Sequence, residues 1–156
     1  MFRSMRRFKQ QLPEEQCLEI LKTESRGVLS LLGDDGYPYG VPIDYFYEDG
    51  KLYFHGAAEG HKVDAMKSCS KASFCVTGPG EKVEGDWALW FNSVIVFGKI
   101  RILEDRSEIL KQVRKLGEKY YPTQDEEEEV MQRSGGRVAC FELTIEHMTG
   151  KRVHEK

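Results

Sequence analysis

The stretch GDDGYPYGVPIDYFYEDGKLYFHG, residues 33–56, decides the expected fold because it contains two Asp-Gly pairs. Asp35-Gly36 and Asp49-Gly50 are typical of tight two-residue hairpin turns, in which both central residues take a positive φ. Between them, residues 38–49 alternate in the manner of a half-buried strand. With GVLSLL (27–32) before them and KLYFHG (51–56) at the end, they predict a three-stranded antiparallel meander.

Three further strands are expected, in KASFCVTG (71–78), NSVIVFGKIRILED (92–105) and RVACFELTIEHM (137–148). The second is long enough to bend around a barrel, with Gly98 as a kink. Helices are predicted at 13–23 and 106–120, and a short acidic helix from Thr123 to Gly135-Gly136. Six strand segments, mostly joined as hairpins, predict a mainly β (α+β) fold, a closed or partly closed antiparallel barrel.

The composition favours one globular domain over residues 1–156, with residues 1–12 as an N-terminal arm. The 23 basic and 26 acidic residues give a net charge of −3 and are mixed along the chain, which argues against nucleic acid as a partner. No apolar run is long enough to span a bilayer, and the Arg-rich start lacks a signal core. We therefore expect a cytoplasmic protein without a membrane partner.

Motifs exclude several site classes. The four cysteines form no C-x-x-C pair and are expected to be buried free thiols. The acidic run at 125–129 is expected to be the solvated start of a helix. No metal site is therefore predicted. The standard dinucleotide, P-loop and serine-hydrolase motifs are absent.

A strand-to-helix corner at Gly60, His61 and Lys62 is the strongest site candidate. A helix start carries unpaired N–H groups and partial positive charge, so it attracts anions, phosphate above all. Gly60 would let a ligand approach the backbone, and the two side chains would add donors. The alternative is an ordinary turn with two solvated side chains. Pro42 suggests an edge strand, a bulge or a ligand contact, because proline cannot donate to a sheet ladder.

The chain also resembles a known family. The segment GDDGYPYGVPIDYFYEDGKLYFHGAAEGHKVDAMKS (33–68), the strand SVIVFGKIRILED (93–105) and IEHMTGK (145–151) are similar to the pyridoxamine 5′-phosphate oxidase-like flavin-binding split barrels. They resemble in particular the branch that includes the 5-nitroimidazole resistance proteins. The resemblance implies a six-stranded antiparallel split β-barrel with Greek-key character and peripheral helices. It also implies FMN, with FAD as the alternative, bound between the subunits of a homodimer.

The resemblance assigns cofactor-binding roles to four groups of residues. The first lies along the flavin and is followed by the second, while the third holds the phosphate; two polar residues then begin the long strand. In this sequence they are Val41, Pro42, Ile43 and Asp44; His55 and Gly56; Gly60, His61 and Lys62; and Asn92 and Ser93. His61 is also a candidate catalytic acid, because its reference pKa of about 6.5 lies near working pH.

Two features differ from the vitamin B6 oxidases. His61 stands where those enzymes usually place arginine, which loses a bidentate contact. The chain also lacks their extra C-terminal strand, and the R-x-H fragment at Arg152 and His154 is expected to be a frayed tail. Oxidation of pyridoxamine phosphate is therefore not expected.

The function expected from this resemblance is an FMN-dependent oxidoreductase with a small-molecule substrate. NAD(P)H would bind transiently and reduce the flavin, and the flavin would reduce nitro-aromatic compounds such as nitroimidazoles. A non-catalytic flavin- or haem-binding module for storage, sensing or delivery is the alternative, and a dimeric packing domain without cofactor is a third hypothesis. His55 either packs or contacts the isoalloxazine edge. His147 is expected to be structural, although a related protein could use it for haem.

Other candidates are weaker. Trp87, Trp90 and Phe91 either roof a planar substrate or pack in the core or a dimer interface. Glu142 and Glu146 are expected to face solvent from the last strand.

Overall fold

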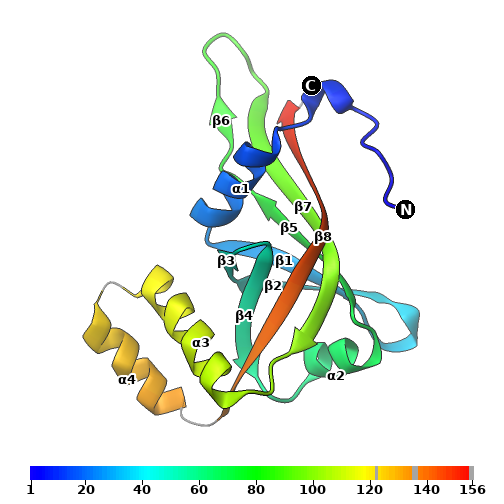
Figure 1. Cartoon of the computed structure of the whole chain (residues 1–156). Coiled ribbons are helices and arrows are strands. Elements are labelled where there is room, and N and C mark those ends of the chain that lie inside the picture. Colours follow the sequence, from blue (N-terminus) through cyan, green and yellow to red (C-terminus); the bar gives the residue numbers. More distant parts are fainter. Residues whose placement is uncertain (122, 135–136, 155–156) are drawn as a thin grey trace.

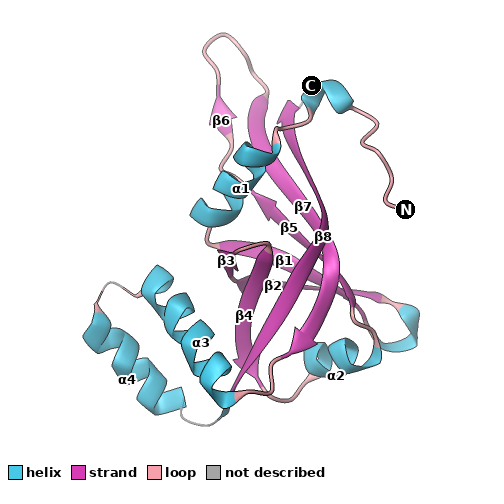
Figure 2. Cartoon of the chain, in the orientation of Figure 1, coloured by secondary structure: helices cyan, strands magenta, loops and turns pink. Residues whose placement is uncertain are grey.

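The computed structural model describes residues 1–121, 123–134 and 137–154. Its centre is one antiparallel sheet, curled into a half-barrel with helices around it (Figures 1 and 2). Seven strands follow each other in the order β2-β1-β5-β7-β8-β4-β3, and the short β6 pairs with β7. The strands are β1 (Arg26–Leu32), β2 (Pro38–Asp44), β3 (Phe46–Glu48), β4 (Lys51–Ala57), β5 (Lys71–Thr77), β6 (Glu81–Lys82), β7 (Leu89–Ile102) and β8 (Val138–His154).

The two Asp-Gly pairs turn the chain as predicted. Asp35, Gly36, Asp49 and Gly50 all have positive φ, between 47° and 76°. Only glycine and a few polar residues adopt this region without strain. The first turn joins β1 to β2 and the second joins β3 to β4. The predicted strand at 38–49 is divided at Tyr45 into β2, which pairs with β1, and β3, which pairs with β4. The prediction of a three-stranded meander was therefore wrong, because the two hairpins lie at opposite ends of the strand order.

Strands β7 and β8 form the longest pair in the sheet, from Trp90 opposite His154 to Ile102 opposite Phe141. The register shifts between Phe97 and Gly98, where the sequence predicted a kink. A Cβ on Gly98 would lie 2.0 Å from the carbonyl oxygen of Thr144, so the bulge requires glycine.

The expectation of a frayed tail was wrong. Residues Arg152 and His154 belong to β8 and pair with β7. The His154 ring stacks on Trp90 at 4.0 Å, and its Nε2 lies 2.7 Å from a carboxylate oxygen of Asp86. These side-chain contacts, which alternation does not reveal, hold the end of the strand.

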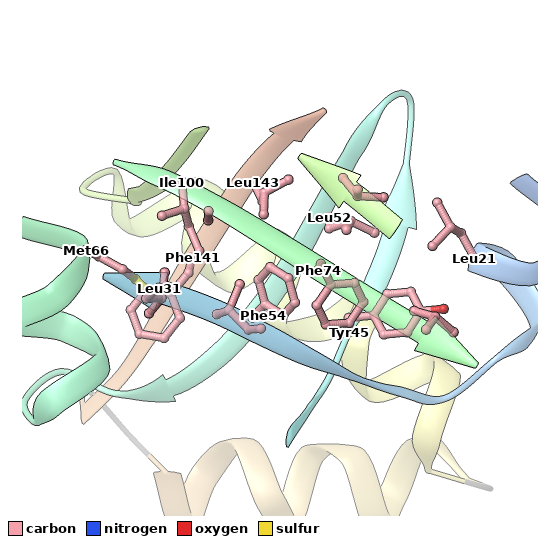
Figure 3. Close-up of a cluster of buried hydrophobic side chains, with 14 of the residues drawn as sticks. Leu21, Leu31, Tyr45, Leu52, Phe54, Met66, Phe74, Ile100, Phe141 and Leu143 are labelled. Carbon is pink, nitrogen blue, oxygen red and sulfur yellow. The ribbon is translucent and has the colours of Figure 1, made fainter. Parts of the chain in front are cut away.

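The core fills the concave side of the sheet. Its largest side chains come from strands that are distant in sequence, and α1 (Glu14–Thr23) and α2 (His61–Ser68) close its ends (Figure 3). The buried side chains of this core include Leu21 of α1, Met66 of α2, and Leu31, Tyr45, Phe54, Phe74 and Phe141. Removing apolar surface from water stabilises the folded chain by about 25 cal/mol per Å².

A second apolar cluster lies on the outer side, beneath α3 (Arg106–Tyr120), and contains Tyr53, Leu103, Leu116 and Cys140. For this reason the prediction that Glu142 faces solvent was wrong. Its side chain is 2% exposed, and its carboxylate accepts hydrogen bonds from Arg101 Nε at 2.8 Å and Lys51 Nζ at 3.4 Å. Glu146 is exposed, as expected.

The predicted helix signals are confirmed. The Asp105 side chain accepts a hydrogen bond from the Glu108 N–H at the start of α3, and the Thr123 hydroxyl does the same for Glu126 at the start of α4 (Gln124–Ser134). The predicted end of α4 at Gly135-Gly136 lies outside the described residues. Within the described part of the chain, no helix is both long and apolar enough to cross a membrane.

The described cysteines, Cys17, Cys69, Cys75 and Cys140, are all free thiols. Cys17 and Cys140 are buried, and burial raises the pKa of the Cys140 thiol to about 12. No group of three metal-ligating side chains gathers among the described residues.

Candidate functional site

Strand β2 forms one edge of the sheet, which explains how it accommodates Pro42. Gly33 and Tyr37 form a hydrogen-bonded pair, in which the Gly33 N–H donates to the Tyr37 carbonyl. Hydrogen-bonded pairs alternate with non-hydrogen-bonded pairs along an antiparallel ladder. Every second residue of β2 from Tyr37, including Val41 and Ile43, therefore bonds to β1. Pro42 and Asp44 therefore direct their backbone groups to the open side. The missing N–H of Pro42 costs no ladder bond, and the open side of β2 is available to a ligand.

An open pocket of about 340 Å³ lies at the end of β2, lined by Arg26, Pro42, Ile43, Asp44 and His55. Three elements meet here: the start of β1, the end of β2 and the end of β4. Four of these five residues are among the cofactor-binding residues predicted from the sequence. The fifth, Arg26, was not predicted.

Arg26 and Asp44 form an ion pair within this pocket. The guanidinium Nε donates to Asp44 Oδ1 at 2.7 Å, and the two residues face each other in the β1–β2 register. The hydrogen bond that Arg26 donates to Asp44, followed by the charge of that carboxylate, raises the pKa of Arg26 further above its ordinary value. The Arg26 guanidinium is therefore charged at neutral pH.

The C-terminal end of α3 ties together the strand ends that carry this pair. The Tyr120 hydroxyl lies 2.6 Å from the carbonyl oxygen of Tyr45, accepts from the Tyr45 N–H at 3.0 Å and contacts the carbonyl of Ser25. Lys119 Nζ donates to the carbonyls of Glu24 at 2.7 Å and Tyr45 at 3.1 Å. These contacts fix the backbone on both sides of the pocket.

The corner before α2 has the geometry of an anion site. Gly60 has φ +122°, which requires glycine, and a Cβ added there would meet no atom within 4 Å. Its carbonyl accepts from the N–H groups of Val63 and Asp64, and no side chain caps the helix. The N–H groups of His61 and Lys62 have no hydrogen-bond partner among the described residues. They are unused donors at the positive end of a helix.

Lys62 and His55 link this corner to the pocket. A Cβ on Gly56 would lie 2.9 Å from Lys62 Cε and 3.1 Å from Nζ, so the lysine side chain lies directly over that glycine. Burial, with the charge of Lys62, lowers the pKa of the adjacent His55, and the charge of Asp44 opposes this. His55 therefore favours its uncharged form and interacts electrostatically with both the Lys62 ammonium and the Asp44 carboxylate.

His61 lies on the other side of the corner, toward the β1–β2 turn. Its ring stacks on Tyr39 at 4.0 Å, and Nε2 lies 3.9 Å from a carboxylate oxygen of Asp34. The ring is thus oriented by a neighbouring strand and remains partly exposed beside the helix start.

The corner and the pocket together fit a planar cofactor with a phosphate. A dianion at the corner would meet two free backbone N–H groups and the Lys62 ammonium, while a ring system would lie along the open edge of β2 toward His55. Gly60 leaves the space at the helix start open, and Gly56 lets the Lys62 side chain lie close against β4.

The model of the family described as pyridoxamine 5′-phosphate oxidase matches residues 13–152. The chain belongs to this family. The match covers the sheet, the α2 corner and the pocket, and therefore includes every cofactor-binding residue predicted from the sequence. No curated protein sequence matches the chain.

Solved structures share the fold of this pyridoxamine 5′-phosphate oxidase family member. A protein of Bacteroides thetaiotaomicron described as a candidate 5-nitroimidazole antibiotic resistance protein has a TM-score of 0.79 and 19% identity, covering 92% of this chain and 87% of that one. An FAD-binding protein of Mesorhizobium loti has a TM-score of 0.66 and 24% identity, and the match covers 92% of this chain and 96% of that one. An FAD- and haem-binding protein of Mycobacterium smegmatis has a TM-score of 0.71 and 18% identity, and the match covers 94% of this chain and 74% of that one.

One predicted pair lies far from the site within a single chain. Asn92 and Ser93 lie near the start of β7, whereas the other end of that strand, where Ile100 bonds to Ser70, adjoins α2 (Figure 1). Seven residues of strand separate Ser93 from Ile100, roughly 23 Å at the usual rise. In one chain, Asn92 instead accepts a hydrogen bond from Arg152 at 3.5 Å.

The remaining candidates are distributed around the molecule. Val41 packs its side chain against the core and lies outside the pocket lining. Trp87 is 80% exposed and so does not pack in the core of the described chain. His147 stacks against Phe2 of the N-terminal arm at 4.7 Å.

The sequence reasoning did not identify Arg26. Its only signal was a charged residue directly before a buried strand, which is common at strand ends. Its importance depends on the register that places it opposite Asp44.

Proposed function

We propose that this chain is a cytoplasmic FMN-dependent oxidoreductase that acts as a homodimer and reduces small nitro-aromatic compounds. The observation that carries the proposal is the uncapped α2 start, with Lys62 beside it, lying next to an open-edge pocket. Family membership and the flavin named for two of the similar structures support the cofactor. The four free thiols are compatible with a reducing compartment.

A bound flavin would supply the electron transfer, and the protein would supply binding and orientation. The N–H groups of His61 and Lys62 and the Lys62 ammonium would hold the phosphate. The backbone of Pro42 and Asp44 would border the ring at the open edge. FMN satisfies these contacts with its single phosphate, and FAD remains the alternative that direct titration tests.

The homodimer is supported by an exposed apolar face. Val28, Cys75 and Ile95 are neighbours in adjacent strands, and the same row begins with Pro42 at the edge of the pocket. Val28 and Ile95 are exposed large apolar side chains. Burying such a face against its own copy is favourable, and a two-fold axis brings different parts of the two faces together.

A second subunit would also account for the position of Asn92. The pair Asn92 and Ser93 lies on β7 just before Ile95, so a partner docked on this face could present its own pair to the α2 corner. The site would then be complete only in the dimer. Ile95→Glu should give a monomer by light scattering, with weaker FMN binding.

The function is tested by the spectrum of the purified protein and by titration with FMN. We expect flavin absorption, reduction by NAD(P)H without oxygen and reoxidation by a nitroimidazole. Absence of flavin, with no binding of added FMN or FAD, would contradict the proposal. Flavin that binds but does not turn over would favour the storage or sensing module, and a haem spectrum would favour its haem-binding form.

A further inference from the structure

Arg26 presents unused hydrogen-bond donors to the pocket. Among the described residues its side chain makes one hydrogen bond, from Nε to Asp44, and the two terminal nitrogens have no hydrogen-bond partner there. The side chain is 68% exposed, so these nitrogens are accessible. Asp44 thus binds the guanidinium through Nε alone, and the fork formed by the two terminal nitrogens of Arg26 stays free.

The fork is held on a rigid frame. Tyr120 and Lys119 fix the backbone of Ser25 and Tyr45, the residues adjacent to Arg26 and Asp44. Lys119 is also packed over the Tyr45 ring, with its Nζ 4.2 Å from the ring centre. A preorganised guanidinium loses less entropy when it binds a ligand than a free surface arginine does.

The geometry of a guanidinium selects its ligands. Two parallel N–H groups match two coplanar oxygens on one atom, the arrangement found in carboxylates and shared by nitro groups. Pro42 and Ile43 give the same pocket an apolar wall, and His55 is uncharged beside it. The pocket therefore combines an apolar wall with a pair of guanidinium donors for two coplanar oxygens.

We propose that Arg26 is a substrate-binding residue that recognises the nitro or carboxylate group of a planar aromatic compound next to the flavin. This inference rests on the proposed function, because the flavin must occupy the site for the substrate to stack there. It specifies the substrate class: a flat ring that carries two coplanar oxygens on one atom.

The test uses the FMN-loaded protein and three probes of similar shape: benzoate, nitrobenzene and benzamide. Binding is followed by the change in flavin absorption, and FMN affinity is measured separately by fluorescence. We expect benzoate and nitrobenzene to bind more tightly than benzamide. Arg26→Gln should weaken both at least about tenfold while FMN affinity stays within twofold. Arg26→Lys, which keeps the charge without the fork, should recover benzoate only in part and nitrobenzene hardly at all.

Arg114→Gln serves as the matched control, because it removes an exposed arginine from the middle of α3, away from the pocket lining. Thermal melts check that each variant is folded. Loss of FMN binding in Arg26→Gln would assign the residue to the cofactor and overturn the inference. Equal binding of all three probes by the wild type, or unchanged binding in Arg26→Gln, would overturn it as well. If the wild type binds no flavin, the proposed function fails and the inference fails with it.

Discussion

The Glu142 carboxylate lies buried on the outer side of the sheet and accepts a hydrogen bond from the half-exposed guanidinium of Arg101 at 2.8 Å. The pair is asymmetric: the glutamate side chain is 2% exposed and the arginine 58%. Removing one partner is therefore not equivalent to removing the other.

Arg101→Met should cost more stability than Glu142→Gln. The first leaves a buried carboxylate without its guanidinium partner, while the second leaves two cations that can reach water. We expect losses of about 2 and about 1 kcal/mol in the free energy of unfolding, measured with urea. Equal losses, or the reverse order, would contradict this account of the pair.

The same carboxylate should make stability depend on pH. Burial raises the pKa of Glu142, but the hydrogen bond and charge of Arg101, with help from Lys51, outweigh it, so the pKa lies below its ordinary 4.5. Because the folded value is depressed, the stabilisation is complete above pH 4.5 and is lost as pH falls through the folded value. The stability difference between wild type and Glu142→Gln should therefore shrink below pH 4.5. A constant difference across a pH series of urea titrations would rule this out.

Lys62→Ala should weaken FMN binding by about 1.5 to 3 kcal/mol, the usual worth of a hydrogen bond to a charged group. The reason is its place beside the free N–H groups of α2. Lys67→Ala is the matched control, since it removes an exposed lysine from the last turn of the same short helix. Fluorescence titrations compare the two variants, and equal losses would indicate a general charge effect instead of a phosphate contact.

Gly98→Ala should destabilise the sheet by about 3 kcal/mol or more, because its Cβ would lie 2.0 Å from the Thr144 carbonyl oxygen. Gly80→Ala is the control, since its Cβ would make ordinary contact with Leu89 at 3.5 Å. Thermal melting of both variants provides the measurement. A melting temperature for Gly98→Ala near that of the wild type would mean that the bulge can shift.

Local chemistry explains which parts of the fold could be predicted. The two Asp-Gly turns and the Asp105 cap are set by residues adjacent in sequence, and the structure places them as expected. The candidate corner at the start of α2 could be located for the same reason: glycine and two basic residues follow a strand directly.

Features that depend on distant partners were missed. Glu142 alternates like a surface residue, and only the packing of α3 over β8 buries it. His154 looked like part of a loose end until its strand pairing and Trp90 fixed it. Arg26 became notable only through its register with Asp44. In each case the deciding contact joins segments that sequence patterns treat separately.

The open side of β2 also has a consequence for the protein before any cofactor binds. An unpaired strand edge is a template for a strand from another molecule, and such pairing leads to fibrils. Pro42 removes one of the donors that an incoming strand would need. The residue that borders the proposed ligand site should thus also protect the newly made chain from aggregation.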